Sequence, residues 1–219
     1  MLALLVLLLL APATAAAQER TIAVKGAATL AVPNDTASLG LSVSKERKTR
    51  AAALRIVAIR LREVIAVAQT SPGVGPGDVT TGRISLRKLT RDKRTVYRAS
   101  EGISVILHQP DRAGELIGAA IAAGATGTRG PSFFPGNPDL AYENVLIAAF
   151  AQAKAKATAV AQRAGATLGP AISIEEGTEA IPSPAAEQKG SSQTPEPSPP
   201  VKPGTSTVTA TVRVVFALQ

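Results

Sequence analysis

The sequence contains no cysteine and no tryptophan, and a single histidine, His108, among 219 residues. Without thiols the chain cannot form disulfides, hold zinc or iron–sulfur clusters through cysteine, or use a cysteine nucleophile. A metal site that included His108 would need carboxylates as all its other ligands. We therefore predict no catalytic residue, no cofactor and no metal site, and a protein that is not an enzyme. A hydrolase that uses only carboxylates is the enzymatic alternative.

Aromatic residues make up only 3% of the chain, and none is interleaved with its basic segments as a base-stacking surface requires. Nucleic acid is therefore not an expected partner. The 24 Lys and Arg exceed the 16 Asp and Glu, and the excess is concentrated in Lys45–Glu63 and Arg83–Arg98. These segments are either a solvated face of a basic protein or a binding surface for anionic lipid or polysaccharide.

The first residues are apolar from Leu2 to Ala11 and are followed by Ala15-Ala16-Ala17. A short apolar run followed by small residues is typical of a secretory signal peptide, which we place at residues 1–17. The run is too short to span a bilayer, so we expect no transmembrane span once the signal is cleaved. The mature domain would then cover residues 18–219.

Alternating apolar residues predict several strands. Ile22–Val32 and Ala37–Val43 flank Pro33-Asn34-Asp35, a spacing that predicts a hairpin. A second hairpin is predicted from Val79–Leu89 and Val96–His108, with a charged turn between them. Further strands are predicted near Thr128–Phe134, Ala171–Glu175 and Val208–Phe216.

Three helices are predicted from apolar residues that recur every three or four positions. The first carries Leu54, Val57, Leu61, Val64 and Ala68 and stops at Ser71-Pro72-Gly73; the second starts at Asp111 as N-cap and ends at Gly124. The longest starts at Asn137-Pro138-Asp139 and runs to about Ala164. Its predicted buried stripe, mostly alanine, would let another backbone approach closely: Tyr142, Leu146, Ala149, Ala153, Ala157, Val160 and Ala164.

These elements predict an α+β fold of two small lobes, with antiparallel or mixed sheets covered by helices on one face, in the order ββαββαβαββ. Residues 181–204 hold seven prolines among Ser, Glu and Gln, a composition that predicts a flexible loop within the domain. We expect deletion of Pro184–Pro199 to leave the fold intact.

Other motifs favour structural roles. Gly73-x-Gly75-x-Gly77 follows a helix instead of a strand, so it predicts a turn and not a phosphate-binding loop. Asp35 is expected to cap its own turn, and Tyr97 to lie in the core or at a sheet edge. Phe133 and Phe134 point to opposite faces of one strand, so one of them is a candidate for exposure. It is either an apolar residue that packs under a loop or the mark of a self-association surface.

An ordered set of motifs extends from Thr21 to Leu218: Ile22-x-Val24-x-Gly26, Pro33-Asn34-Asp35-Thr36-Ala37, Asp78-Val79-x-Thr81, Tyr97, Asn137-Pro138, Ala153-Lys154-Ala155-Lys156-Ala157, Ala161, Gly165, Leu168-Gly169 and Val214-Val215-Phe216. This ordered set resembles the SIMPL-domain family of bacterial exported proteins. The resemblance implies a periplasmic or envelope location, homo-oligomers and a link to stress tolerance. It supplies no catalytic residue.

Overall fold

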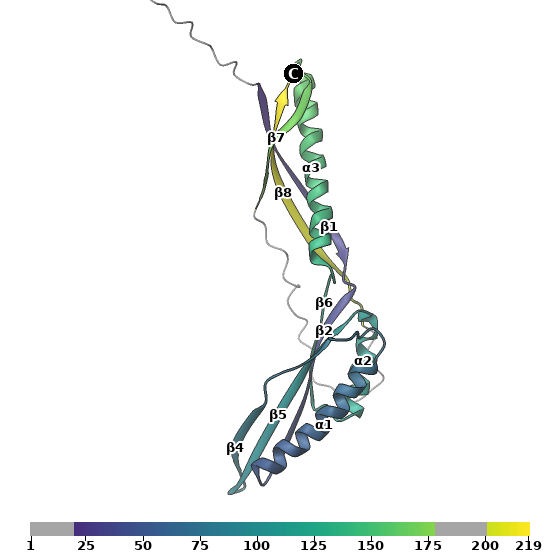
Figure 1. Ribbon diagram of the computed structural model, residues 1–219, viewed down its shortest axis with the longest axis vertical. Helices are drawn as coiled ribbons and strands as arrows, with labels where there is room; N and C mark the ends of the chain where they lie inside the picture. The colour runs from purple at the N-terminus through teal and green to yellow at the C-terminus, as the bar shows by residue number, and fades with distance from the viewer. Residues whose placement is uncertain (1–19, 178–200) are drawn as a thin grey trace, which may run out of the picture.

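Two antiparallel sheets organise the residues that the computed structural model describes, 20–177 and 201–219. Each sheet belongs to one lobe, and the lobes lie end to end in an elongated molecule (Figure 1). The elements in chain order are β1 (Thr21–Pro33), β2 (Thr36–Arg47), α1 (Arg50–Thr70), β3 (Val79–Thr81), β4 (Ser85–Arg91), β5 (Arg94–Leu107), the 3-10 turn η1 (Pro110–Arg112), α2 (Ala113–Ala122), β6 (Gly127–Phe134), α3 (Pro138–Arg163), β7 (Leu168–Glu176) and β8 (Thr205–Leu218). The predicted α+β class and its two lobes are confirmed.

The three-stranded lobe has the strand order β1-β8-β7, with α3 packed on one face. The predicted alternation of β8 is confirmed, because Val208, Ala210, Val212, Val214 and Phe216 are all buried. The stripe predicted for α3 is confirmed at Ala149, Ala153 and Ala157, which are fully buried, and Tyr142 and Leu146 are half-buried against the core. It is wrong at Val160 and Ala164, which are exposed. The stripe repeats every four residues along the whole helix, at Ala141, Val145, Ala149, Ala153, Ala157 and Ala161.

The alanine stripe allows the close approach that its composition predicted. A Cβ atom placed on Gly26 of β1 would overlap the carbonyl oxygen of Ala149 and would lie 2.8 Å from the backbone nitrogen of Ala153. Only glycine fits at this position, because any other side chain would displace the helix from the sheet.

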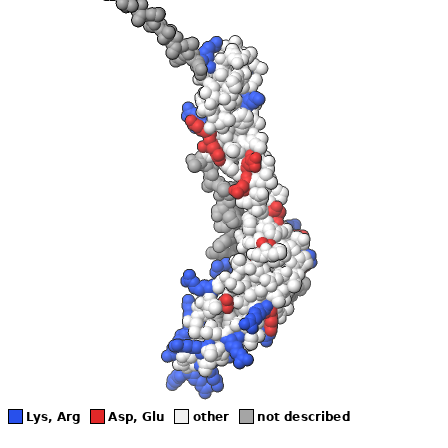
Figure 2. Space-filling view, viewed as in Figure 1, with Lys and Arg blue, Asp and Glu red and all other residues white. Residues whose placement is uncertain are grey.

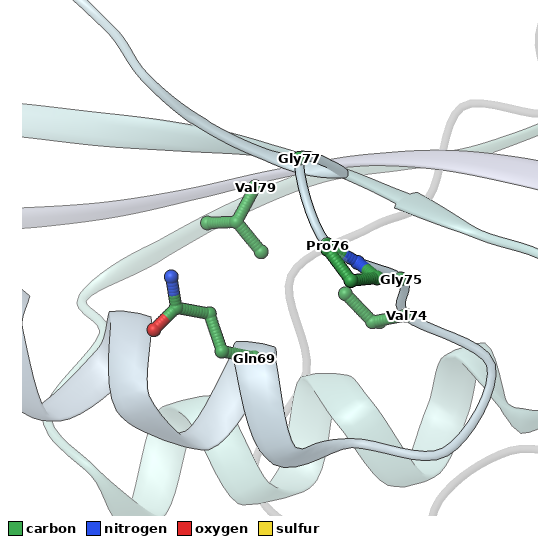
Figure 3. A pocket seen from close by; sticks show the side chains of 6 residues that line it. All are labelled: Gln69, Val74, Gly75, Pro76, Gly77 and Val79. Carbon is green, nitrogen blue, oxygen red and sulfur yellow. The ribbon is translucent and has the colours of Figure 1, made fainter.

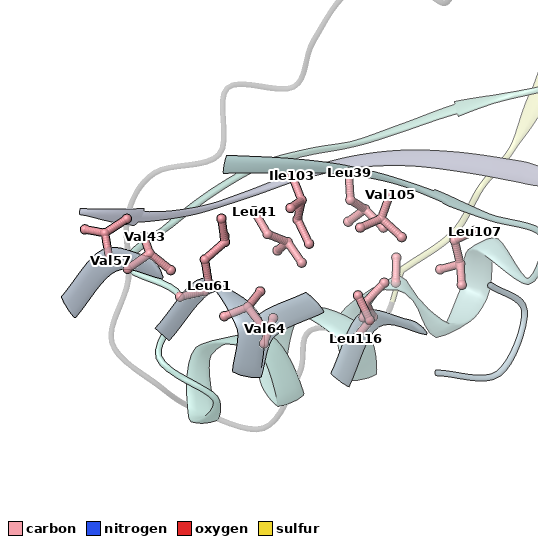
Figure 4. Close-up of a cluster of buried hydrophobic side chains, with 14 of the residues drawn as sticks. Leu39, Leu41, Val43, Val57, Leu61, Val64, Ile103, Val105, Leu107 and Leu116 are labelled. Carbon is pink, nitrogen blue, oxygen red and sulfur yellow. The ribbon is translucent and has the colours of Figure 1, made fainter. Parts of the chain in front are cut away.

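The five-stranded lobe has the order β3-β5-β2-β6, and β4 also pairs with β5. Helices α1 and α2 lie on one face of this sheet and enclose its core (Figures 1 and 4). The core is made by the alternate residues of β2 and β5 that face α1, including Leu39, Leu41, Val43, Ile103 and Val105.

The predicted hairpin of β1 and β2 is wrong. β1 pairs with β8 from Thr21↔Ala217 to Pro33↔Thr205, whereas β2 pairs with β5 and β6. Between β1 and β2 the chain passes from the three-stranded sheet into the five-stranded sheet without turning back, because Asn34 is hydrogen-bonded to the segment before β8. Its backbone N donates to the Gly204 carbonyl at 3.2 Å, and its side-chain Nδ2 donates to the Pro203 carbonyl at 2.9 Å.

The second predicted hairpin is confirmed in β4 and β5, although its first strand is divided into β3 and β4. Its turn residues Asp92 and Lys93 have φ angles of 46° and 60°, as a tight two-residue turn requires. The predicted cap of α2 is wrong, because Asp111 lies in η1 and the N-cap position is Arg112, without a side-chain cap bond. The predicted cap of α3 is confirmed: Asn137 Oδ1 accepts from the backbone N of Leu140 at 3.0 Å.

Candidate functional site

The two basic segments of the sequence meet at the end of the five-stranded lobe farthest from the other lobe. β2 ends there, α1 begins there, and the β4–β5 turn lies beside them (Figure 1). Figure 2 shows Lys and Arg gathered at this end of the molecule. We call this region the basic tip; it contains the acids Glu46 and Asp92 and ten bases: Lys45, Arg47, Lys48, Arg50, Arg87, Lys88, Arg91, Lys93, Arg94 and Arg98.

Four arginines of the tip share one face of the β4–β5 hairpin. Arg87 lies directly opposite Arg98, and Arg91 lies directly opposite Arg94. Arg98 is also opposite Glu46 on β2, so the glutamate lies on the same face. We call Arg87, Arg91, Arg94 and Arg98 the arginine face.

Glu46 holds two of these guanidinium groups. Its Oε1 accepts from Arg98 Nε at 2.9 Å and from Arg98 Nη2 at 2.5 Å, and it lies 3.4 Å from Arg91 Nη2. The hydrogen bond from Arg98, supported by Arg91, lowers the pKa of the Glu46 carboxyl below its ordinary value, and partial desolvation opposes this shift only in part. Glu46 is therefore the charged anchor of the arginine face.

The other face of the hairpin turns toward α1. Tyr97 packs against the core of the lobe, as predicted, and the guanidinium carbon of Arg50 lies 5.4 Å from the centre of its ring. This cation–π contact fastens the start of α1 to β5. The only tyrosine of the tip is thus on the face opposite the arginine face.

The glycine motif forms a turn, as predicted. Asp78 Oδ2 accepts from the backbone N of Gly75 at 2.7 Å and lies 3.1 Å from His108 Nε2, and the backbone N of His108 donates to the Gly73 carbonyl at 2.7 Å. The pocket beside the turn is shallow and has no charged side chain in its lining (Figure 3). Its volume of about 200 Å³ is below the range of small-molecule sites.

Acidic side chains that a carboxylate-only hydrolase could use, Asp35, Glu175 and Glu176, are each engaged in structural contacts. Asp35 Oδ1 accepts from Thr36 Oγ1 at 3.1 Å and from the backbone N of Gly136 at 2.5 Å, so it joins the two chain segments that link the lobes as well as its own turn. Glu176 accepts from the Tyr142 hydroxyl at 2.7 Å, and Glu175 lies opposite Arg213. Within 20–177 and 201–219, no three His, Asp or Glu side chains form a group that could hold a metal ion.

The exposed apolar surface is not where the sequence placed it. Phe133 and Phe134 are both half-buried, and Phe133 packs against the core of the five-stranded lobe. The premise that one of the two is exposed is therefore wrong. Large exposed apolar residues occur instead in both lobes, and two of them lie close together on the edge strand β7, where Ile172 is 50% and Ile174 is 59% exposed.

No helix in the described part of the chain has the length and apolar character needed to cross a bilayer. Comparison with known proteins assigns most of the chain to one family: the model of SIMPL, described as a protein of unknown function (DUF541), matches residues 22–216. The 26 kDa periplasmic immunogenic protein of Brucella melitensis is 26% identical to this chain over 217 residues, which cover 92% of this chain and 86% of that protein.

Proposed function

The chain belongs to the SIMPL family, and from this premise we propose that it is an exported periplasmic protein without enzymatic activity that assembles with copies of itself and protects the cell envelope under stress. The name of the Brucella relative supports the location. The signal peptide predicted at residues 1–17 also supports it and lies outside the described residues.

The feature that supports self-assembly is β7, one of the two edge strands of the three-stranded sheet. Among the described residues β7 pairs only with β8, so the backbone groups along its other side have no strand in that part of the chain to bond. Helix α3 packs mainly on β1 and β8 and leaves Ile172 and Ile174 of β7 exposed. A second copy that pairs with this edge would satisfy the backbone groups and remove both isoleucine side chains from water.

The mass of the chain 18–219 by multi-angle light scattering tests this proposal. We expect a discrete multimer that persists in high salt, since apolar contacts are not screened by ions. The double variant Ile172→Ser with Ile174→Ser should shift the mass toward the monomer. The control is Ile84→Ser, which removes an isoleucine that is 55% exposed in the other lobe and should leave the mass unchanged. A monomer at every concentration, or an unaltered double variant, would contradict the proposal.

The basic tip favours a second function, the binding of anionic lipid or polysaccharide. Two segments that are separate in the sequence converge there, with only two acids among ten bases. Co-sedimentation with anionic vesicles or with alginate tests this function, and binding should weaken steeply as salt rises. Self-assembly should respond to salt in the opposite direction, because screening reduces repulsion between basic copies.

A further inference from the structure

We propose that the arginine face recognises the phosphate groups of anionic phospholipids at a membrane surface. The inference rests on the second proposed function. It narrows the ligand from anionic surfaces in general to phosphate groups, and it narrows the binding surface from the whole basic tip to four arginine side chains. Three features of this surface support it: the pairing of the arginines, their anchoring by Glu46, and the shape of the sheet around them.

The pairing of the arginines is unfavourable for the isolated fold. Arg87 faces Arg98 and Arg91 faces Arg94, and like charges directly opposite each other on neighbouring strands destabilise a hairpin. Glu46 offsets only part of this repulsion, because within the described residues its carboxylate forms ion pairs with Arg98 and Arg91 but not with Arg87 or Arg94. Bound anionic groups would neutralise all four side chains and relieve this repulsion. The arginine face is therefore more stable with an anionic ligand bound than without one.

Glu46 uses only some of the N–H groups of Arg98 and Arg91, so the other N–H groups of these two side chains can still donate to a ligand. Arg98 uses Nε and Nη2 toward Glu46, so its Nη1 group remains available; Arg91 uses Nη2 and keeps Nε and Nη1. Arg87 and Arg94 are exposed and have no ion pair with any described residue. The planar guanidinium fork matches two phosphate oxygens at once, a geometry that a lysine ammonium cannot provide.

The shape of the surface favours a flat array of phosphates. Next to the arginine face, the outer side of the sheet carries Ser42, Ser44, Ser100 and Gly102, and both helices lie on the other side. Between the two arginine pairs, the half-buried Leu89 and Val96 lie opposite each other on the same face. A polysaccharide would lack an aromatic surface for its rings, because Tyr97 faces α1. Phospholipid headgroups are therefore the ligand that this surface fits.

The first test separates guanidinium geometry from charge. Binding of the chain 18–219 to phosphatidylcholine vesicles containing phosphatidylglycerol is compared with binding of a variant in which Arg87, Arg91, Arg94 and Arg98 are all replaced by Lys. Net charge is unchanged, and we expect at least a tenfold weaker apparent affinity. The matched control replaces four arginines elsewhere and should bind like the parent protein: Arg55, Arg60, Arg62 and Arg163 to Lys. Equal binding by both variants would overturn the proposal.

The second test uses Glu46. Glu46→Gln adds one positive charge to the tip, so binding by charge alone would become stronger. The proposal predicts weaker binding, because Arg98 and Arg91 lose the carboxylate charge that holds them in place. The control Asp92→Asn adds the same charge in the turn, at a φ of 46° that asparagine tolerates, and should not weaken binding. Circular dichroism checks that both variants are folded, and stronger binding by Glu46→Gln would contradict the proposal.

The third test distinguishes the ligand. Vesicles whose charge comes from oleate, at the same surface potential, should bind the protein more weakly than phosphatidylglycerol vesicles, and inorganic phosphate at constant ionic strength should compete only weakly. Equal binding to both kinds of vesicle would overturn the phosphate proposal and leave the second proposed function intact. No binding to either kind of vesicle or to alginate would overturn both.

Discussion

Gly26 fixes the distance between β1 and α3, because its missing side chain is what lets the helix lie on the strand. We expect Gly26→Ala to lower the free energy of unfolding by about 2–3 kcal/mol, the upper part of the usual range for overpacking, since the new methyl group meets helix backbone that cannot move away by itself. Chemical denaturation measures the change.

The control for this substitution is Gly40→Ala in β2. There the nearest atom to an added Cβ is the Cβ of Arg129 on β6 at 3.3 Å, a tight contact that a shift of a few tenths of an ångström between the two strands would relieve. Its effect should be well below that of Gly26→Ala. Equal effects at the two positions would show that β1 and α3 are not as tightly joined as their geometry indicates.

Glu46 makes the stability of the tip depend on pH. Its pKa in the folded chain is lowered from the ordinary value of 4.5, chiefly by Arg98, so its ion pairs stabilise the fold fully above that value. This contribution is lost as the pH falls through the lower, folded-state pKa. We expect the difference in free energy of unfolding between the parent protein and Glu46→Gln to shrink as the pH falls from about 6 to below about 4. A difference that stays constant or grows would contradict the assignment.

At the scale of elements, local signals in the sequence predicted where the strands and helices lie better than they predicted which strands pair with one another. Asn137-Pro138 predicted the start of α3 because a cap is a contact between neighbours in the chain. The alternation in β1 and β2 predicted two strands correctly, but period two carries no information about which strand lies alongside. β1 finds its partner in β8, far away in the sequence, and Asn34 is held by carbonyls from that same distant segment.

The same limit applies to the candidate site. The sequence showed two basic segments, and neither one predicts that β2, β5 and β4 lie side by side and bring both to one end of a sheet. The exposed isoleucines of β7 were missed for a related reason. Whether these isoleucines are buried depends on whether α3 covers that edge of the sheet. The residues of β7 themselves do not indicate the position of α3.

The cap of α3 can be tested as an element of its own. Asn137→Ala removes the acceptor of the Leu140 N–H bond at the helix start, and we expect a loss of about 1 kcal/mol in the free energy of unfolding. Asn144→Ala, exposed inside the same helix, is the matched control and should be neutral or slightly stabilising, because alanine has the higher helix propensity. If both variants lost a similar amount of unfolding free energy, the loss in Asn137→Ala could not be attributed to the cap.

At the scale of the whole molecule, we expect the fold to tolerate a shorter connection from β7 to β8; most of the proline-rich segment predicted there lies outside the described residues. The backbone N of Gly177 bonds the Thr211 carbonyl, six residues from Thr205, so the connection must span about 20 Å. Deletion of Pro184–Pro199, most of the proline-rich segment, leaves residues 178–183 and 200–204, which can reach about 35 Å. We expect a melting temperature within a few degrees of that of the parent protein. A larger fall would show that the deleted residues stabilise the fold, a role that their composition does not predict.

The division of the chain between the two lobes has a consequence for the order in which they form. The five-stranded lobe uses one continuous stretch, from Thr36 to Phe134, so most of its contacts close early and at small entropic cost. The three-stranded lobe must bring β1 together with β8 across everything in between. During refolding we expect two kinetic phases, with α1 and its sheet complete in the first. Until β8 is available, β1 remains an unpaired strand on an otherwise folded molecule, and this intermediate is the state most exposed to proteases and to wrong partners.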